Sequence, residues 1–133
     1  MTSETVYVET SVVVGILLGE PDSLDLAIGV KSAGRRLTGV NNAIEAAISV
    51  GRRINDFELA QQGVLDLIHN FGVEMVAAPV EVFGPAVQAY ERYGKGRQHP
   101  AQLNFGDCIS LAMAQHHRAR LLYKGNDFAL AGL

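Results

Sequence analysis

The strongest constraint on the fold of this chain is an alternation of short β-rich segments with longer helical ones. Between the β-rich segments, the spacing of apolar residues predicts helices of about 10–17 residues. Strands separated by helices pair in parallel, so the sequence predicts an α/β fold with a mostly parallel, short-stranded sheet flanked by helices. The predicted strands cover residues 5–9, 35–38, 73–77 and 120–123.

Capping residues and glycines mark the predicted helix boundaries. Thr10 or Ser11 can cap a helix after the first strand, and Asn41 or Asn42 can cap one after the second. A glycine-rich basic loop, 94–100, precedes the last long helix, and 125–127 reads as a turn. The other helices are predicted over residues 23–33, 55–71, 80–93 and 104–117.

Length and composition indicate one globular domain, residues 1–133. Hydrophobic residues make up 48% of the chain and charged residues 19%, which excludes a disordered chain. The longest apolar run, 12–19, is too short to span a membrane. With an acidic N-terminus and one cysteine, the sequence predicts a cytoplasmic protein. The net charge of −3 argues against a general nucleic-acid coat.

Four acidic residues lie where a parallel sheet places its functional groups. Glu9 ends the first predicted strand, and Asp127 follows the last. Glu45 and Asp107 lie in the first turns of predicted helices. Because the carboxyl ends of parallel strands meet at one edge, all four carboxylates could converge there. A divalent cation such as Mg²⁺ or Mn²⁺ would relieve their repulsion, and phosphate chemistry uses these metals.

Each of these acids also has a purely structural interpretation. Glu45 and Asp107 each follow an asparagine by three residues, which is the spacing of a capping box. Asp127 belongs to a predicted turn, and Glu9 could be a solvated strand end. Composition and spacing leave the metal site and the structural roles both open.

Nearly the whole chain resembles one known family. The resembling stretches include Val-Tyr-Val-Glu-Thr-Ser from residue 6 and Leu-Thr-Gly-Val-Asn-Asn-Ala-Ile-Glu from residue 37. The most specific are Leu-Asn-Phe-Gly-Asp-Cys, which ends at Cys108, and Lys-Gly-Asn-Asp-Phe, which ends at Phe128. These stretches resemble the PIN-domain ribonucleases, specifically the VapC-type toxins of bacterial toxin–antitoxin pairs. The resemblance implies a single PIN domain with three layers.

The resemblance also implies an activity and its residues. It implies a metal-dependent endoribonuclease toxin of a type II toxin–antitoxin pair, in which metal-activated water cleaves RNA phosphodiesters. Ser11 matches a hydroxyl that holds the first acid or a metal-bound water, with Thr10 as a second supporting residue. The implied catalytic residues and ligands of Mg²⁺ or Mn²⁺ are Glu9, Glu45, Asp107 and Asp127.

The partners implied by the resemblance are a VapB-like antitoxin, an RNA substrate such as tRNA or rRNA, and a second copy of the chain. The sequence offers four basic residues for an RNA-binding rim. These RNA-binding candidates are Arg92, Lys95, Arg97 and Lys124.

Glu9 departs from the family pattern, in which the first acid is normally Asp. One extra methylene moves the carboxylate outward by roughly 1–1.5 Å, and such displacements can cost about 100-fold in rate. The alternative function is therefore a catalytically weakened PIN domain that mainly binds antitoxin or RNA. The chain also ends in Ala131-Gly132-Leu133, without the auxiliary fifth acid of many relatives. A receiver domain fits poorly, because no Asp follows the strand at 73–77.

Overall fold

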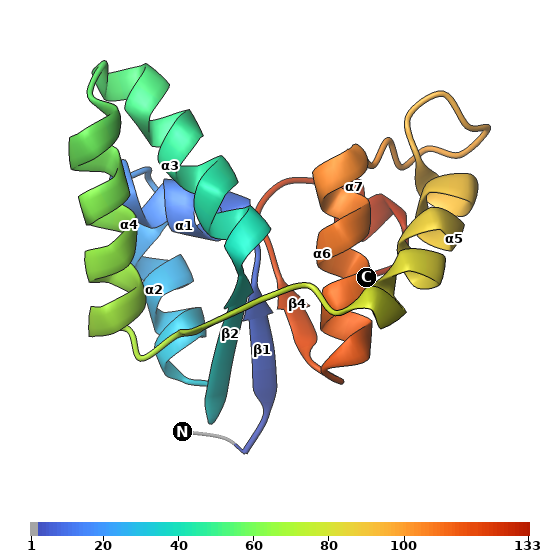
Figure 1. Ribbon diagram of the computed structural model, residues 1–133, viewed down its shortest axis with the longest axis horizontal. Coiled ribbons are helices and arrows are strands. Elements are labelled where there is room, and N and C mark those ends of the chain that lie inside the picture. The colour runs from blue at the N-terminus through green and yellow to red at the C-terminus, as the bar shows by residue number, and fades with distance from the viewer. Residues whose placement is uncertain (1–2) are drawn as a thin grey trace.

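The computed structural model describes residues 3–133 as a four-stranded sheet between two groups of helices (Figure 1). The strands lie in the order β3-β2-β1-β4, and every neighbouring pair is parallel. The α/β fold and the parallel sheet are thereby confirmed. The strands are β1 (Thr5–Val8), β2 (Arg35–Gly39), β3 (Glu74–Val76) and β4 (Arg120–Leu122).

The helices form two layers on opposite sides of the sheet (Figure 1). One layer contains α1 (Thr10–Leu17), α2 (Ser23–Lys31), α3 (Val40–Ile54) and α4 (Phe57–Asn70). The other contains α5 (Phe83–Tyr93), α6 (Phe105–His116) and the short α7 (Asp127–Leu130). A 3₁₀ helix, η1 (Val80–Val82), precedes α5, so the helix predicted over 80–93 begins with a tighter turn. No helix in the described part combines the length and apolarity that crossing a membrane requires.

Strand β1 is buried on both faces, which explains its uninterrupted apolar sequence. Val6 and Val8 belong to a core cluster shared with α1 to α4. Tyr7, on the opposite face, belongs to a second cluster with residues of α5, α6 and α7. Two separate cores therefore sandwich one central strand, and a single residue, Glu9, connects that strand to α1.

Two helix starts differ from the sequence prediction. Glu9, rather than Thr10 or Ser11, is the N-cap of α1, and it is only 6% exposed, so its interpretation as a solvated strand end was wrong. Helix α3 begins at Val40 with Gly39 as its N-cap, so Asn42 lies inside the helix and is fully buried. Asn42 therefore caps nothing, and the proposed capping box with Glu45 is absent.

Other boundaries follow the predicted capping residues more closely. Asn104 caps α6 and forms a capping box with Asp107, as its spacing predicts. Helix α4 begins two residues later than predicted, because Asp56 is its N-cap and Asn55 adopts a left-handed conformation (φ 56°) that ends α3. The predicted turn at 125–127 leads directly into α7.

Candidate active site

Helices α1, α3 and α6 begin at the carboxyl edge of the sheet (Figure 1). Glu9 caps α1, Glu45 lies in the second turn of α3, Asp107 lies in the first turn of α6, and Asp127 begins α7. Their charges interact: Asp107 and Glu45 both contribute to raising the pKa of Glu9, and Asp127 contributes to raising the pKa of Asp107. Four acids separated by up to 118 positions in sequence thus share one electrostatic environment. Within residues 3–133, however, no three carboxylate, imidazole or thiol groups converge closely enough to coordinate one ion as they stand.

Glu9 is held by Ser11. The backbone N–H of Ser11 donates to Glu9 Oε1 at 3.1 Å, and the Ser11 hydroxyl donates to the same oxygen. The backbone N–H of Lys124, after β4, donates to Ser11 Oγ at 2.9 Å. Burial raises the pKa of Glu9 and the Ser11 hydrogen bonds oppose this increase. Ser11 therefore connects the first acid to the segment that leads to Asp127.

Glu45 is held by Thr10 and faces the start of α6. The Thr10 hydroxyl donates to Glu45 Oε1 at 3.2 Å. A Cβ atom added to Gly106 would lie 2.5 Å from Glu45 Oε2, so the carboxylate lies directly against the backbone beside Asp107. Burial raises the pKa of Glu45; the hydrogen bond from Thr10 lowers it and the charge of Asp107 raises it further. The absence of a side chain at position 106 thus makes room for the second acid.

Asp107 belongs both to the capping box of α6 and to the acidic cluster. Its Oδ2 accepts from the Asn104 N–H at 2.9 Å, and its own N–H donates to Asn104 Oδ1 at 2.8 Å. Burial raises the pKa of Asp107; the Asn104 N–H and the nearby Lys95 charge lower it. The capping box thus holds both the backbone N–H and one carboxylate oxygen of Asp107, and the charge of Asp107 still acts on Glu9 and Glu45, so this residue belongs to the helix cap and to the acidic cluster.

The buried charge of Glu9 should lower the stability of the metal-free protein at neutral pH. Because the pKa of Glu9 is raised on folding, its ionised form is destabilising above that pKa, and the penalty disappears as the pH falls. We expect Glu9→Gln to raise the melting temperature at pH 7 in EDTA by roughly 3 °C. The difference should shrink toward pH 4 in a thermal unfolding series.

Glu91→Gln is the control for that series, because Glu91 is an exposed glutamate on α5. Its melting temperature should follow that of the unmodified protein at both pH values. A Glu9→Gln protein that melts below the unmodified chain at pH 7 would show that the Glu9 charge is compensated in the folded state.

The contact between Gly106 and Glu45 gives a prediction about activity without loss of stability. We expect Gly106→Ala to displace the Glu45 carboxylate and to reduce the RNA cleavage that the resemblance implies about 100-fold, the scale of a 1 Å misplacement. The displaced atom ends a flexible side chain, and Ala favours helix over Gly, so the melting temperature should not fall.

Gly84→Ala is the matched control for this substitution. Gly84 is the second residue of α5, as Gly106 is of α6, and each follows an exposed phenylalanine. Nothing lies within 4 Å of a Cβ built on Gly84, so its alanine variant should cleave RNA normally. Equal cleavage rates for the two alanine variants would contradict the assigned role of the Gly106 contact.

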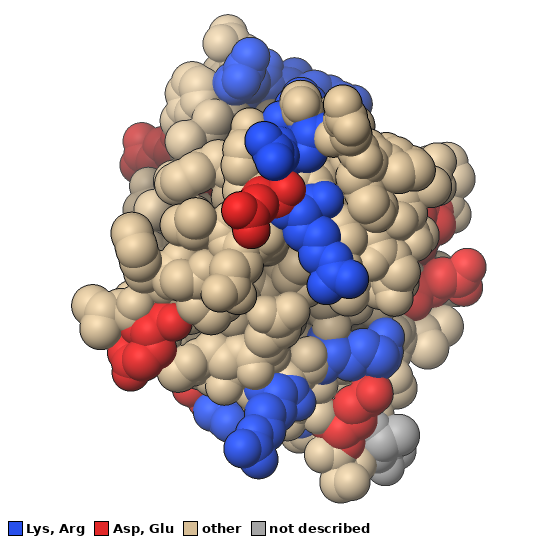
Figure 2. All heavy atoms as spheres, turned by 90° about the vertical axis from the view of Figure 1, so that its right-hand side faces the viewer, with Lys and Arg blue, Asp and Glu red and all other residues tan. Residues whose placement is uncertain are grey.

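The basic RNA-binding candidates divide into two groups. Lys95 lies near the acids, since its positive charge lowers the pKa of Asp107, which burial raises. Arg92 and Arg97 lie around the same loop. Figure 2 shows lysine and arginine side chains on the face that carries α5, with acidic side chains among them. Lys124, in contrast, forms ion pairs with Glu20 and Asp22, each at 2.9 Å, so its ammonium group is already neutralised within the fold.

A polar core that the sequence did not predict lies beneath the acids and consists of Tyr7, Asn42 and Ser110. All three side chains are fully buried and hydrogen-bonded to one another through Asn42. The available signal was the position of Asn42 in the buried stripe of α3, one turn before Ala46 and two turns before Val50. A polar residue on the apolar face of a helix indicates a specific buried partner.

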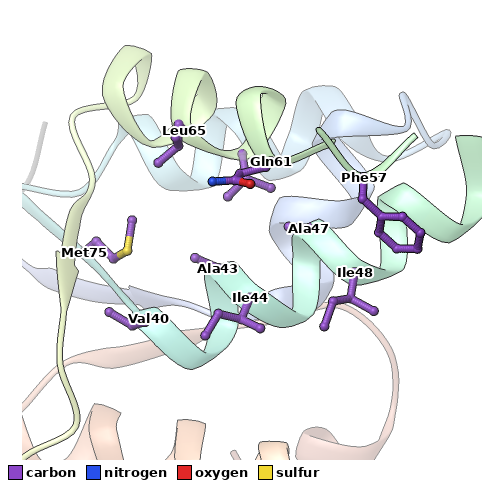
Figure 3. Close-up of a pocket in the computed structure, with 10 residues that line it drawn as sticks. Val40, Ala43, Ile44, Ala47, Ile48, Phe57, Gln61, Leu65 and Met75 are labelled. Atoms are coloured by element: carbon purple, nitrogen blue, oxygen red, sulfur yellow. The ribbon is translucent and has the colours of Figure 1, made fainter. Parts of the chain in front are cut away.

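A second surface feature is an apolar groove of about 410 Å³ between α3, α4 and β3 (Figure 3). No titratable side chain lines it, and Ile44, Ile48 and Phe57 are about half exposed there. Met75 lies at this groove and is 37% exposed. The groove borders the face of α3 that carries Glu45 but is separate from the acidic cluster.

Comparison with known proteins identifies the family. Residues 6–132 match the model of the PIN domain. VapC ribonuclease Mb0640 of Mycobacterium bovis is 35% identical over 122 residues, covering 91% of this chain and 90% of that protein. Ribonuclease VapC of Mycolicibacterium smegmatis is 38% identical over 124 residues, covering 92% and 93%.

Among solved structures, the fold matches Mycobacterium tuberculosis VapC20, described as a toxin that cleaves the sarcin–ricin loop. The TM-score is 0.71 at 14% identity, covering 96% of this chain and 95% of VapC20. The family match over residues 6–132, together with this fold, thus defines a PIN domain. The chain belongs to the PIN-domain family, within its VapC ribonuclease toxins.

Proposed function

We propose that this protein is a divalent-metal-dependent endoribonuclease and the toxin of a type II toxin–antitoxin pair. The observation that carries the proposal is the approach of Glu9, Glu45, Asp107 and Asp127 at one edge of the sheet. Burial and mutual repulsion disfavour the ionised forms of three of these acids, so the protein maintains a costly concentration of negative charge. Such a cost is typical of a functional site.

The carboxylate oxygens and the excess of negative charge make this cluster suitable for Mg²⁺, with Mn²⁺ as an alternative. The four acids would hold it, and when bound it would activate water and neutralise charge on the phosphate. The protein supplies the orientation: Ser11 fixes Glu9, Thr10 fixes Glu45, and Asn104 fixes Asp107. Because the ligands do not converge as they stand, binding requires their carboxylates to turn toward one another.

The substrate proposed is RNA, with tRNA or rRNA as the class. Lys95 supports this proposal, because a cation beside Asp107 can hold a phosphate next to the acids. Arg97 and Arg92 extend the basic loop, whereas Lys124 is a weaker candidate because its charge is already paired. The protein would act in the cytoplasm, where these RNAs occur.

The proposed partners are a VapB-like antitoxin and a second copy of the chain. An antitoxin that places a basic side chain among the carboxylates would compensate the same charge that a metal ion compensates. A homodimer can be tested by sedimentation equilibrium of the purified toxin. A single 14.3 kDa species at micromolar concentration would argue against it.

A second candidate function is a PIN domain with weakened catalysis that mainly binds antitoxin or RNA. The observation in its favour is that Glu9 Oε1 already accepts two hydrogen bonds from Ser11, while the Glu side chain is one methylene longer than the usual Asp. This function predicts binding without turnover.

Cleavage of total RNA by purified, antitoxin-free protein tests the main proposal. Discrete RNA fragments with Mg²⁺ or Mn²⁺, absent in EDTA, are the expected result. Fragments carrying a 5′-phosphate would support attack by water on the phosphodiester. Metal-independent cleavage would contradict the proposal, and RNA binding without any cleavage would favour the second function.

A further inference from the structure

Asn42 forms the centre of a fully buried hydrogen-bond network beneath the acids. The Tyr7 hydroxyl donates to Asn42 Oδ1, and Asn42 Nδ2 donates to Thr10 Oγ1 at 2.9 Å and to Ser110 Oγ at 2.8 Å. The exposed fractions of Tyr7, Asn42 and Ser110 are all 0%. One carboxamide thus connects β1, α1, α3 and α6, the elements that carry or adjoin three of the acids.

The orientation of this carboxamide follows from the hydrogen-bonding capacity of its partners. An ionised Glu45 carboxylate can only accept, so the Thr10 hydroxyl must use its single proton for Glu45 Oε1. Thr10 Oγ1 must then accept from Asn42, which places the NH₂ group of Asn42 toward Thr10 and its carbonyl oxygen toward Tyr7. Burial raises the pKa of the Tyr7 phenol, so Tyr7 remains a proton donor.

We propose that Asn42 is a positioning residue that acts through Thr10 to set the orientation of the Glu45 carboxylate for the metal ion. This inference rests on the proposed function, because Glu45 needs its orientation only as a ligand. The path runs from Tyr7 through Asn42 and Thr10 to Glu45, and Ser110 is a side branch that does not lead to any acid. Partners that orient a metal ligand typically contribute 10- to 100-fold to metal affinity.

The branch provides a matched pair of variants. Thr10→Val and Ser110→Ala each remove one hydroxyl and leave one N–H of the same buried amide without its partner. The two variants should therefore lose similar amounts of melting temperature in the absence of metal. Only Thr10→Val also removes the donor to Glu45, so only this variant should bind metal more weakly.

The test measures Mn²⁺ binding by titration calorimetry in the absence of RNA. We expect Thr10→Val and Asn42→Ala each to weaken Mn²⁺ binding about 10-fold, and Ser110→Ala to leave it unchanged. The double variant Asn42→Ala/Thr10→Val should bind Mn²⁺ no more weakly than Thr10→Val alone, because both substitutions interrupt one path.

Three results would overturn the inference. They are equal Mn²⁺ affinity of Thr10→Val and Ser110→Ala, unchanged affinity of Asn42→Ala, or additive losses in the double variant. If Asn42→Ala does not fold, the comparison of Mn²⁺ affinity between Thr10→Val and Ser110→Ala still tests the inference. Absence of Mn²⁺ binding by the unmodified chain would instead refute the metal-dependent function, and with it the role of Asn42.

Discussion

Asp107→Asn is expected to lower the rate of metal-dependent RNA cleavage about 1,000-fold while the protein remains folded. Asp107 lies in the middle of the cluster, since its charge acts on Glu9 and Glu45 and the charge of Asp127 acts on it. Removing one preorganised charged group from an active site commonly costs about 100- to 1,000-fold in rate. The measurement is the initial rate of cleavage of a single purified RNA at saturating Mg²⁺.

The folded state should tolerate this substitution. An asparagine side-chain oxygen can still accept from the Asn104 N–H, and the burial that raises the pKa of Asp107 no longer acts on an ionised group. Asp25→Asn is the matched control, because Asp25 lies in the first turn of α2 as Asp107 lies in the first turn of α6. Full cleavage activity in a folded Asp107→Asn protein would falsify the assignment of this site.

The second large effect is expected in the opposite direction. Glu9→Asp should raise the rate of metal-dependent cleavage about 100-fold, because it shortens a buried side chain that is otherwise displaced by roughly 1 Å. Aspartate is also a favoured N-cap residue, so it can take over the bond from the Ser11 N–H at the start of α1. Cleavage rates of both proteins over a series of Mn²⁺ concentrations measure the effect.

The outcome at position 9 also distinguishes the two candidate functions. Activity confined to Glu9→Asp would mean that the unmodified chain is a binding protein with an intact but misplaced ligand set. A Glu9→Asp protein no faster than the unmodified chain would show that Glu9 already suits the metal, and the weakened-catalysis function would be abandoned. Glu9→Gln, which keeps the length and removes the charge, should be inactive in either case.

The arrangement of the elements was predictable because the segments differ strongly in character. The segment 5–9 is apolar on both faces, a pattern that only a central strand can bury, and the structure places it between two cores. Asn104 and Asp107 carry a local capping signal that depends on nothing outside the first turn of α6. Local signals of this kind determine strands, helix starts and the parallel connection.

The position of Asn42 on the buried face of α3 indicates a buried partner, but the identity of its partners could not be predicted, because they lie 35, 32 and 68 positions away in sequence. Its spacing from Glu45 matched a capping box, and the local signal was misleading because Gly39 ends β2 and already caps α3. The ion pairs of Lys124 could not be predicted for the same reason: its acidic partners belong to the turn between α1 and α2. In both cases the structure contains a long-range contact that the local sequence does not indicate.

The sequence by itself determined the α/β class, the order of the elements and the positions of Glu9, Asp107 and Asp127 at a strand end or a helix start, since these depend on periodicity and local capping. Glu45 was expected in the first turn of its helix but lies in the second turn of α3, because that helix begins at Val40. Only the tertiary structure decided that Glu9 is buried, that Gly106 leaves room for Glu45, and that Asn42 connects Tyr7 to Thr10. Burial, electrostatic interaction and hydrogen-bond direction are properties of groups in space, and residues distant in the chain acquire them only when the sheet brings its carboxyl edge together.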